Sequence, residues 1–304
     1  MYCFTSTESY YPIKGYCVFA EDYFKKHNFI KACDLQIHYI RMGQGDPALL
    51  LLHGFGANTY TWRKVIEPLS EYTTVIAYDR PAFGFTDRPK RSEWKGSNPY
   101  APEMQPEIVV SLLDALSIDQ AILVGNSAGG TITLQTAYRY PEKVNGLVLV
   151  DAAIYNTGGT PWWARPIIQA FKHIPLSPKL IRPLLPAGDR ALRLAWHDPS
   201  KIENGVIDGY ATSWQVPGWD QAMWEMVLAT GPIDIAWLPN RIKKPTLVIT
   251  GDNDRIVPTR ESIRLAEEIA DAELVIIPEC GHMPQEECPE QFSEAVLNFL
   301  ARLM

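Results

Sequence analysis

Cysteine, positive charge and long apolar runs are all scarce in this sequence, and each shortage argues against a particular kind of protein or site. The five cysteines are odd in number and lack metal-ligand spacing, so a reducing cytoplasm is the expected location and no metal site is indicated. Lysine and arginine number 28 against 35 aspartate and glutamate residues, and the net charge of −7 argues against a nucleic-acid partner. No stretch reaches the roughly 20 apolar residues that a membrane span needs. Attachment to a membrane surface and the oligomeric state stay open.

The first 28 residues lack a recognisable pattern. They are rich in aromatic residues without clear periodicity, and no basic segment precedes an apolar core and a cleavage site. Residues 1–28 are therefore treated as an N-terminal extension of unknown role. The whole chain has 304 residues, 46% of them hydrophobic, and is long enough to bury one large core.

Short apolar runs alternate with segments of helical character from residue 29 onward. Residues 29–41 alternate well enough to predict two antiparallel strands around a turn at Cys33 and Asp34. The later apolar runs suit strands that are covered on both faces: Ala48–Leu52, Thr74–Tyr78, Ala121–Val124, Leu147–Val150, Thr246–Thr250 and Leu274–Ile277. The segments of helical character include Pro106–Leu116, Ala128–Tyr140, Thr259–Ile269 and Pro289–Leu303. This order predicts an α/β fold with a doubly wound, mostly parallel sheet.

The alternation stops near residue 154 and resumes near Lys244. This interval is rich in proline and holds seven of the nine tryptophans: Trp162, Trp163, Trp196, Trp214, Trp219, Trp224 and Trp237. We therefore expect an inserted helical cap over residues 154–243, with the core of the α/β fold formed by residues 29–153 and 244–304. So many large rings favour an apolar pocket, although most of them are expected to hold the cap together.

The segment from Ala121 to Gly130 joins an apolar strand to a helical run through Gly-Asn-Ser-Ala-Gly. A serine at such a sharp strand-to-helix turn needs small neighbours, and its hydroxyl is lifted above the carboxyl end of the sheet. Ser127 is therefore the predicted nucleophile. A plain tight turn is the alternative that the pentapeptide alone leaves open.

A serine hydroxyl is a weak nucleophile near neutral pH and needs a base within hydrogen-bond reach. His282 follows the last apolar run on a loop before the final helix, and is the predicted general base. His53, at the end of an earlier strand, is the second choice, because a histidine there more often fixes the loop by hydrogen bonds.

The imidazole of the base needs an acceptor that fixes its tautomer and stabilises its cation. The loop after the Thr246–Thr250 run offers Asp252 and Asp254. Asp254 is the predicted acid because it lies farther from the strand, where its side chain can reach the histidine loop. Asp151, at the end of another strand, is a third candidate.

Attack by the serine creates an oxyanion that needs two backbone N–H donors. Ala128, directly after the nucleophile, supplies the first. Phe55, between two glycines on the loop after an early strand, is predicted to supply the second. A plain glycine turn is the alternative at this loop.

In their order along the chain, these motifs resemble the α/β-hydrolase superfamily from about residue 29 onward. They are His53-Gly54-Phe55-Gly56, Tyr78-Asp79-Arg80-Pro81-Ala82-Phe83-Gly84, Gly125-Asn126-Ser127-Ala128-Gly129-Gly130, Gly251-Asp252-Asn253-Asp254 and Gly281-His282. The chain looks most similar to the branch that contains haloalkane dehalogenases, epoxide hydrolases and small esterases. The first two use an aspartate followed by a bulky residue, so Ser127 and Ala128 argue against their chemistry.

The combination predicts a serine hydrolase, a carboxylesterase that cleaves a small ester with an apolar acyl or alcohol part through an acyl-enzyme, without a metal or organic cofactor. One alternative is a carbon–carbon bond hydrolase of a vinylogous diketone, which Asn126, Ser127 and the following glycines also resemble. Such enzymes commonly carry tryptophan after the catalytic histidine, where this chain has Met283. A hydrolase-derived small-molecule receptor is a further alternative. An interfacial lipase, suggested by residues 167–185, ranks last because prolines interrupt that stretch.

Overall fold

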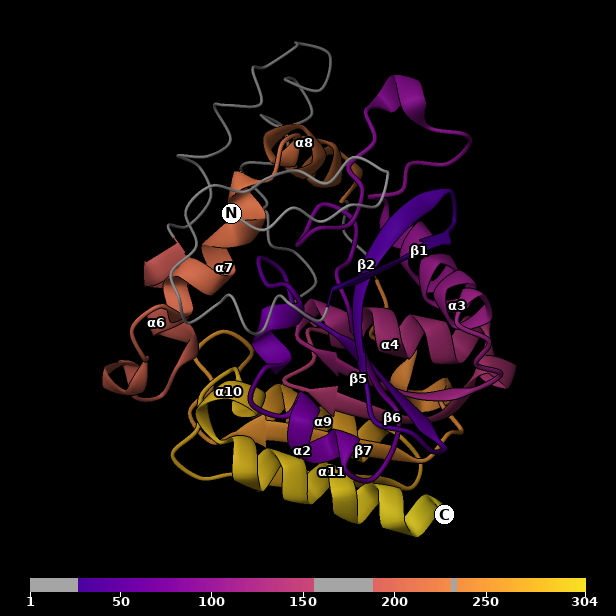
Figure 1. The fold of residues 1–304 in the computed structure, drawn as a ribbon. Helices are drawn as coiled ribbons and strands as arrows, with labels where there is room; N and C mark the ends of the chain where they lie inside the picture. The colour runs from indigo at the N-terminus through magenta and orange to yellow at the C-terminus, as the bar shows by residue number, and fades with distance from the viewer. Residues whose placement is uncertain (1–26, 156–187, 231–233) are drawn as a thin grey trace.

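The computed structural model describes residues 27–155, 188–230 and 234–304, and one eight-stranded sheet lies at its centre (Figure 1). The strands are β1 (Asn28–Ala32), β2 (Leu35–Met42), β3 (Ala48–Leu52), β4 (Val75–Tyr78), β5 (Ala121–Asn126), β6 (Val144–Val150), β7 (Thr246–Gly251) and β8 (Ala272–Ile277). Their order across the sheet is β1-β2-β4-β3-β5-β6-β7-β8. The α-helices are α2 (Ile66–Ser70), α3 (Gln105–Ala115), α4 (Ala128–Arg139), α6 (Gly188–Ala195), α7 (Val206–Gln215), α8 (Trp219–Ala229), α9 (Thr259–Glu268), α10 (Pro284–Glu287) and α11 (Pro289–Leu303).

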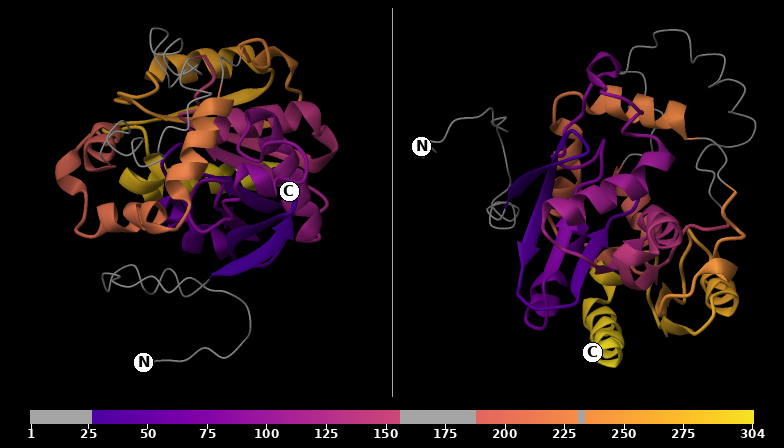
Figure 2. Two further views of the ribbon diagram at one scale, coloured as in Figure 1. Left: turned by 90° about the horizontal axis from the view of Figure 1, so that it is seen from above. Right: turned by 90° about the vertical axis from the view of Figure 1, so that its right-hand side faces the viewer.

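The sheet begins with the predicted hairpin. β1 pairs antiparallel with β2 around Cys33 and Asp34, whose φ angles of 48° and 60° are left-handed. β2 also runs antiparallel to β4, whereas the remaining neighbours are parallel. The right-hand view of Figure 2 places the indigo hairpin and the orange β8 region at opposite ends of the molecule. The predicted doubly wound, mostly parallel sheet is therefore confirmed.

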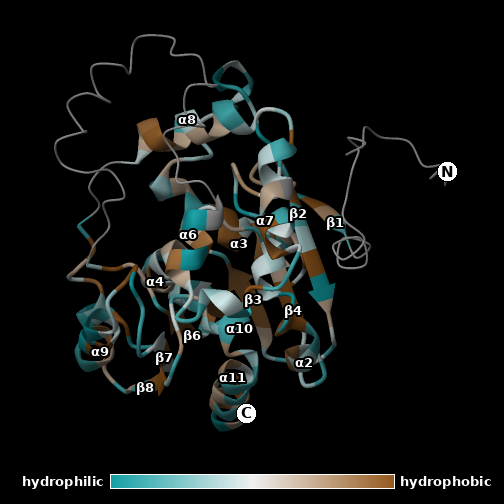
Figure 3. Cartoon of the chain, turned by 90° about the vertical axis from the view of Figure 1, so that its left-hand side faces the viewer, coloured by the Kyte–Doolittle hydropathy of each residue, from teal (hydrophilic) through white to brown (hydrophobic). Residues whose placement is uncertain are grey.

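Two apolar layers cover the faces of the sheet, and Figure 3 shows the apolar strands between them. Alternate residues of a strand point to opposite faces, so Leu50 and Leu52 of β3 pack in one layer and Leu49 and Leu51 in the other. The first layer is completed by side chains of α3, α4 and α9, the second by side chains of α2 and α11. Burial on both faces explains why these strands are apolar at every position.

Two strands start earlier than the apolar runs indicated. β6 begins at Val144, three residues before the predicted start, because Asn145 and Gly146 interrupt the apolar run, and the pairing with β5 continues past Asn145 with a shift of register. β8 begins at Ala272, and its side chains are partly exposed at the sheet edge, where polar residues such as Glu273 are accepted.

Helices α6, α7 and α8 lie within the interval expected to form a cap. They pack on one another in sequence and on the loops after β3 and β4. Trp196 and Trp219 are buried in these contacts, whereas Trp237 is 47% exposed. Trp162, Trp163 and the stretch 167–185 lie outside the described residues, so the division into core and cap stays a prediction. Within the described ranges, no helix combines the length and apolarity needed to cross a bilayer.

Candidate active site

Ser127 is the single residue between β5, which ends at Asn126, and α4, which begins at Ala128. Its φ of 54° and ψ of −117° lie in a region that L-residues rarely adopt, and such strain persists only where the surroundings hold it. The backbone of Ser127 donates to Val150 O at 2.9 Å and accepts from Gly130 N at 2.9 Å. The turn is therefore fixed from both sides.

The glycines around the serine are required by close backbone approach. A Cβ on Gly129 would overlap the carbonyl of Leu52 on β3, and a Cβ on Gly125 would collide with the carbonyl of Gly129. Only glycine lets β3, β5 and α4 come this close, which explains the Gly-x-Ser-x-Gly spacing.

The loop between β8 and α10 carries His282, whose side chain faces Asp254 on the loop after β7. His282 Nδ1 lies 2.6 Å from Asp254 Oδ2, and both residues are buried. The other oxygen, Asp254 Oδ1, accepts the backbone N–H groups of Ile256 at 2.7 Å and Val257 at 3.0 Å. With Nδ1–H donated to a fixed carboxylate, Nε2 of His282 is free to accept a proton from a hydroxyl.

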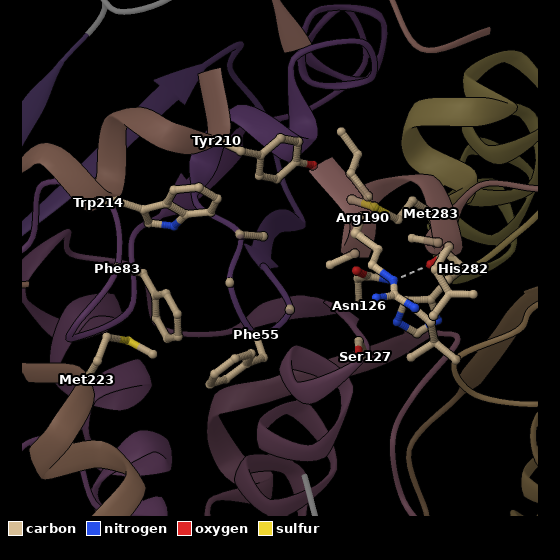
Figure 4. Close-up of a pocket in the computed structure, with 18 of the residues that line it drawn as sticks. Phe55, Phe83, Asn126, Ser127, Arg190, Tyr210, Trp214, Met223, His282 and Met283 are labelled. Atoms are coloured by element: carbon tan, nitrogen blue, oxygen red, sulfur yellow. Dashed lines mark hydrogen bonds between the residues drawn. The ribbon is translucent and has the colours of Figure 1, made fainter. Parts of the chain in front are cut away.

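Asn126 links the serine strand to the histidine loop. Its Nδ2 donates to His282 O at 3.1 Å and to Val150 O at 3.3 Å. Ser127 and His282 line the same cavity, and Figure 4 shows their side chains on one side of it. The sequence motif includes Asn126 but gives no sign of this bridging role.

Asp151, the third acid candidate, lies beside the pair. Its Oδ1 accepts from Thr250 Oγ1 at 2.6 Å, and burial together with the charge of Asp254 raises the pKa of Asp151 well above the usual value. Side-chain ligand atoms of Asp151, Asp254 and His282 all lie within 4.8 Å of one another, a spacing that could surround a cation. Hydrogen bonds from protein groups already occupy three of the four carboxylate oxygens in this cluster.

His53 and Asp252, the other sequence candidates, make contacts that fix loops. The Nδ1 of His53 donates to Gly54 O at 2.8 Å, and its Nε2 accepts from Arg80 N at 3.0 Å. Burial lowers the pKa of His53 to about 3, so this ring stays neutral. Asp252 Oδ1 accepts from Cys280 N at 3.3 Å, next to the histidine loop.

Of the two residues predicted to hold an oxyanion, one lines the cavity and the other directly follows the serine. Phe55 lines the cavity between Gly54 and Gly56. Ala128 is the first residue of α4, where backbone N–H groups have no partner within the helix. Their roles stay predictions that this arrangement allows.

A cavity of about 570 Å³ opens in front of Ser127. Its far wall is mainly aromatic and apolar and includes Phe83, Tyr210, Trp214 and Met223 (Figure 4). Trp219 also lines the cavity. Arg190 on α6 is the one lysine or arginine among the described residues that line it. The sequence alone did not single out Arg190 or Tyr210, because neither stands in a motif.

The family comparison agrees with this geometry. A family model described as "alpha/beta hydrolase fold" matches residues 47–289. The chain belongs to the α/β-hydrolase family. It is accordingly a serine hydrolase of this fold.

Relatives of this α/β-hydrolase act on more than one kind of bond. A 2-hydroxymuconate semialdehyde hydrolase of Pseudomonas sp. (strain CF600) is 33% identical over 267 residues, which cover 85% of this chain and 88% of the relative. Among solved structures, a meta-cleavage product hydrolase from Pseudomonas fluorescens IP01 is 27% identical with a TM-score of 0.66, covering 92% of this chain and all of that one. An N-acyl homoserine lactone degrading enzyme is 26% identical with a TM-score of 0.69, covering 90% of this chain and all of its own.

Proposed function

We propose that this α/β-hydrolase cleaves the carbon–carbon bond next to the keto group of a vinylogous diketone. Ser127 acts as nucleophile, His282 as general base and Asp254 as the acid that orients the histidine. The observation that supports hydrolysis is the hydrogen bond from His282 Nδ1 to Asp254, because His282 lines the same cavity as Ser127. The relatives named as meta-cleavage product and semialdehyde hydrolases support the carbon–carbon bond over the ester that the sequence first favoured.

The lining of the cavity supports a substrate with an apolar body and one anionic end. Aromatic rings such as Trp214 and Phe83 offer flat apolar surface to a conjugated chain. Arg190 offers a permanent positive charge in the same cavity, which suits a carboxylate. One relative is named as a hydrolase of 2-hydroxymuconate semialdehyde, and that compound is such a conjugated carboxylate.

The reaction would proceed in two halves. His282 Nε2 takes the proton of Ser127 Oγ as that oxygen attacks the keto carbon, and the amides of Phe55 and Ala128 hold the oxyanion. Collapse breaks the carbon–carbon bond of the diketone tautomer, the second keto group accepts the electron pair as a conjugated enolate, and the carbon released by cleavage takes the proton from His282. Water, deprotonated by His282, then attacks the acyl-enzyme, the bond between the acyl carbon and Ser127 Oγ breaks, and this oxygen takes the proton from His282 as the acid leaves.

Hydrolysis of a carboxylic ester is the second candidate. Met283 favours it, since this buried side chain lines the cavity where carbon–carbon hydrolases commonly carry tryptophan. The lactone-degrading relative gives further support to acyl–oxygen cleavage.

Steady-state kinetics on matched substrates test the proposal. Purified protein is given a 2-hydroxy-6-ketodienoate, whose visible absorbance disappears on cleavage, and p-nitrophenyl butyrate. We expect kcat/KM for the dienoate to exceed that for the ester by at least about 10-fold, because only the dienoate uses Arg190. The reverse ratio would replace the proposal by the esterase. Absence of turnover together with absence of a fluorophosphonate adduct on Ser127 would favour the receptor alternative.

A further inference from the structure

Asp151 is a fully buried carboxyl group that the proposed mechanism does not use. It follows directly after β6, and its N–H donates to Ile249 O of β7 at 2.9 Å. Because β6 and β7 are parallel neighbours, Asp151 and the loop that carries Asp254 emerge at the same edge of the sheet. The side chain is therefore held next to the predicted acid.

One oxygen of Asp151 has a donor and the other lacks one. Oδ1 accepts the hydroxyl of Thr250, whereas Oδ2 is buried and receives no hydrogen bond from any described group. The Asp254 carboxyl is its neighbour, and two carboxylates have no hydrogen between them unless one is protonated. A proton carried by Asp151 satisfies this orphaned oxygen by donation to Asp254.

The surrounding charges favour that protonation. Within the described part of the chain, the titratable groups beside Asp151 are Asp254, His282 and the thiol of Cys280, and none of these three is a permanent cation. Burial and the charge of Asp254 both raise the pKa of Asp151 well above its ordinary value. Of these two carboxyl groups, Asp151 is thus the one whose surroundings favour the protonated form.

We propose that Asp151 is a positioning residue for His282: it holds Asp254 through its proton, and it becomes the carboxylate that orients the ring when Asp254 is removed. The inference rests on the proposed triad. An oxygen of Asp151 already lies within 4.8 Å of a ring nitrogen of His282, so a side-chain rotation can bring it into hydrogen-bond range. Loss of the Asp254 charge also removes the repulsion that keeps Asp151 protonated.

A mutant cycle of Asp254→Ala, Asp151→Asn and the double variant tests this. Alanine at 254 leaves room for Asp151 and places no amide donor against the ring. Asparagine at 151 still donates to Asp254 but never becomes an anion. The assay uses a substrate whose turnover requires Ser127. In the wild-type background, we expect Asp151→Asn to lower kcat/KM less than about 3-fold. In the Asp254→Ala background, the same substitution should lower kcat/KM at least about 30-fold. Equal factors in both backgrounds would overturn the inference.

Asp252→Asn is the matched control. Asp252 lies on the same loop as Asp254 and accepts from Cys280 N, so its loss perturbs the histidine loop without supplying a second acid. Its effect should be the same in both backgrounds, and circular dichroism should show every variant folded.

Proton NMR of His282 gives a readout that needs no turnover. A ring N–H donated to a carboxylate resonates far downfield, so the signal should persist in Asp254→Ala and vanish in the double variant. Loss of the signal in Asp254→Ala alone would overturn the role of Asp151. If Ser127→Ala keeps full activity while the signal follows this pattern, the proposed function fails and the role of Asp151 stands.

Discussion

The backbone N–H of His282 donates to the carbonyl of Ala195 over 2.6 Å, which joins the loop of the predicted base to the last residue of α6. Glu287 strengthens this junction. Its carboxylate accepts from Gly281 N at 2.8 Å on the histidine loop, and from His197 N at 2.9 Å and Asp198 N at 2.8 Å beyond α6. The cavity wall and the base therefore share one set of hydrogen bonds.

Replacement of Glu287 by glutamine should disturb this junction. The amide places a donor against backbone donors, so we expect a loss of about 1–3 kcal/mol in the free energy of unfolding, measured by urea titration. A fall in kcat should accompany it. Glu290→Gln, at an exposed position on α11, is the control and should leave both quantities unchanged. A Glu287→Gln variant with wild-type stability would contradict the shared-junction interpretation.

Removal of the Ser127 hydroxyl should abolish turnover while the fold persists. We expect Ser127→Ala to lower kcat by at least about 10³-fold, since no other nucleophile would replace it. Mass spectrometry after treatment with a fluorophosphonate should show one adduct on wild type and none on Ser127→Ala. Residual labelling at unchanged rate would place the nucleophile elsewhere.

The charge of Arg190 should matter for one substrate class only. In Arg190→Gln we expect KM for the anionic dienoate to rise about 10-fold or more, because a charge-assisted hydrogen bond is lost, with little change for a neutral ester. Arg193→Gln, an exposed residue on the same helix that does not line the cavity, is the matched control. Equal KM increases for both substrates would indicate a structural role for Arg190.

The two glycines near strands β5 and β6 should differ in their tolerance of alanine. At Gly129 a Cβ meets the rigid carbonyl of Leu52, so Gly129→Ala should lose both activity and stability. At Gly146 the nearest atoms lie at 3.2 Å and one is the flexible end of Leu303, so Gly146→Ala should stay folded and active. Thermal melting and kcat/KM measure the contrast, and similar behaviour of the two variants would refute it.

Protonation of His53 should destabilise the protein in acid. Its folded pKa of about 3 lies below the unfolded value of 6.5, so the unfolded state binds more protons between these pH values and stability falls as pH drops through that window. The slope that one such group can contribute is at most about 1.4 kcal/mol per pH unit. In His53→Asn the free energy of unfolding between pH 4 and 6 should depend less on pH. An unchanged slope would show that His53 is not held neutral.

The mostly parallel sheet could be predicted from the sequence because its signals are local. The run Ala48–Leu52 is apolar on both faces and matches β3 residue for residue. Ser127, Asp254 and His282 each follow a strand end, and the topology of a parallel sheet then brings those ends to one edge.

The other features of the site could not be predicted, because they depend on contacts between segments that are far apart in the sequence. Arg190 and Tyr210 reach the cavity from helices whose placement no motif or strict period encodes. The pairing of Asp151 with Asp254 follows from the adjacency of β6 and β7, which sequence order alone does not give. Their roles emerge from packing.

The two hydrogen bonds of Asn126 have a consequence for the reacting groups. The short amide side chain of Asn126 spans the gap between the end of β5, next to Ser127, and the loop that carries His282. A side chain one methylene longer would push that loop outward and lengthen the path of the transferred proton, although neither the hydroxyl nor the imidazole had been altered. Residue 126 thus acts as a spacer that sets the reach of the base.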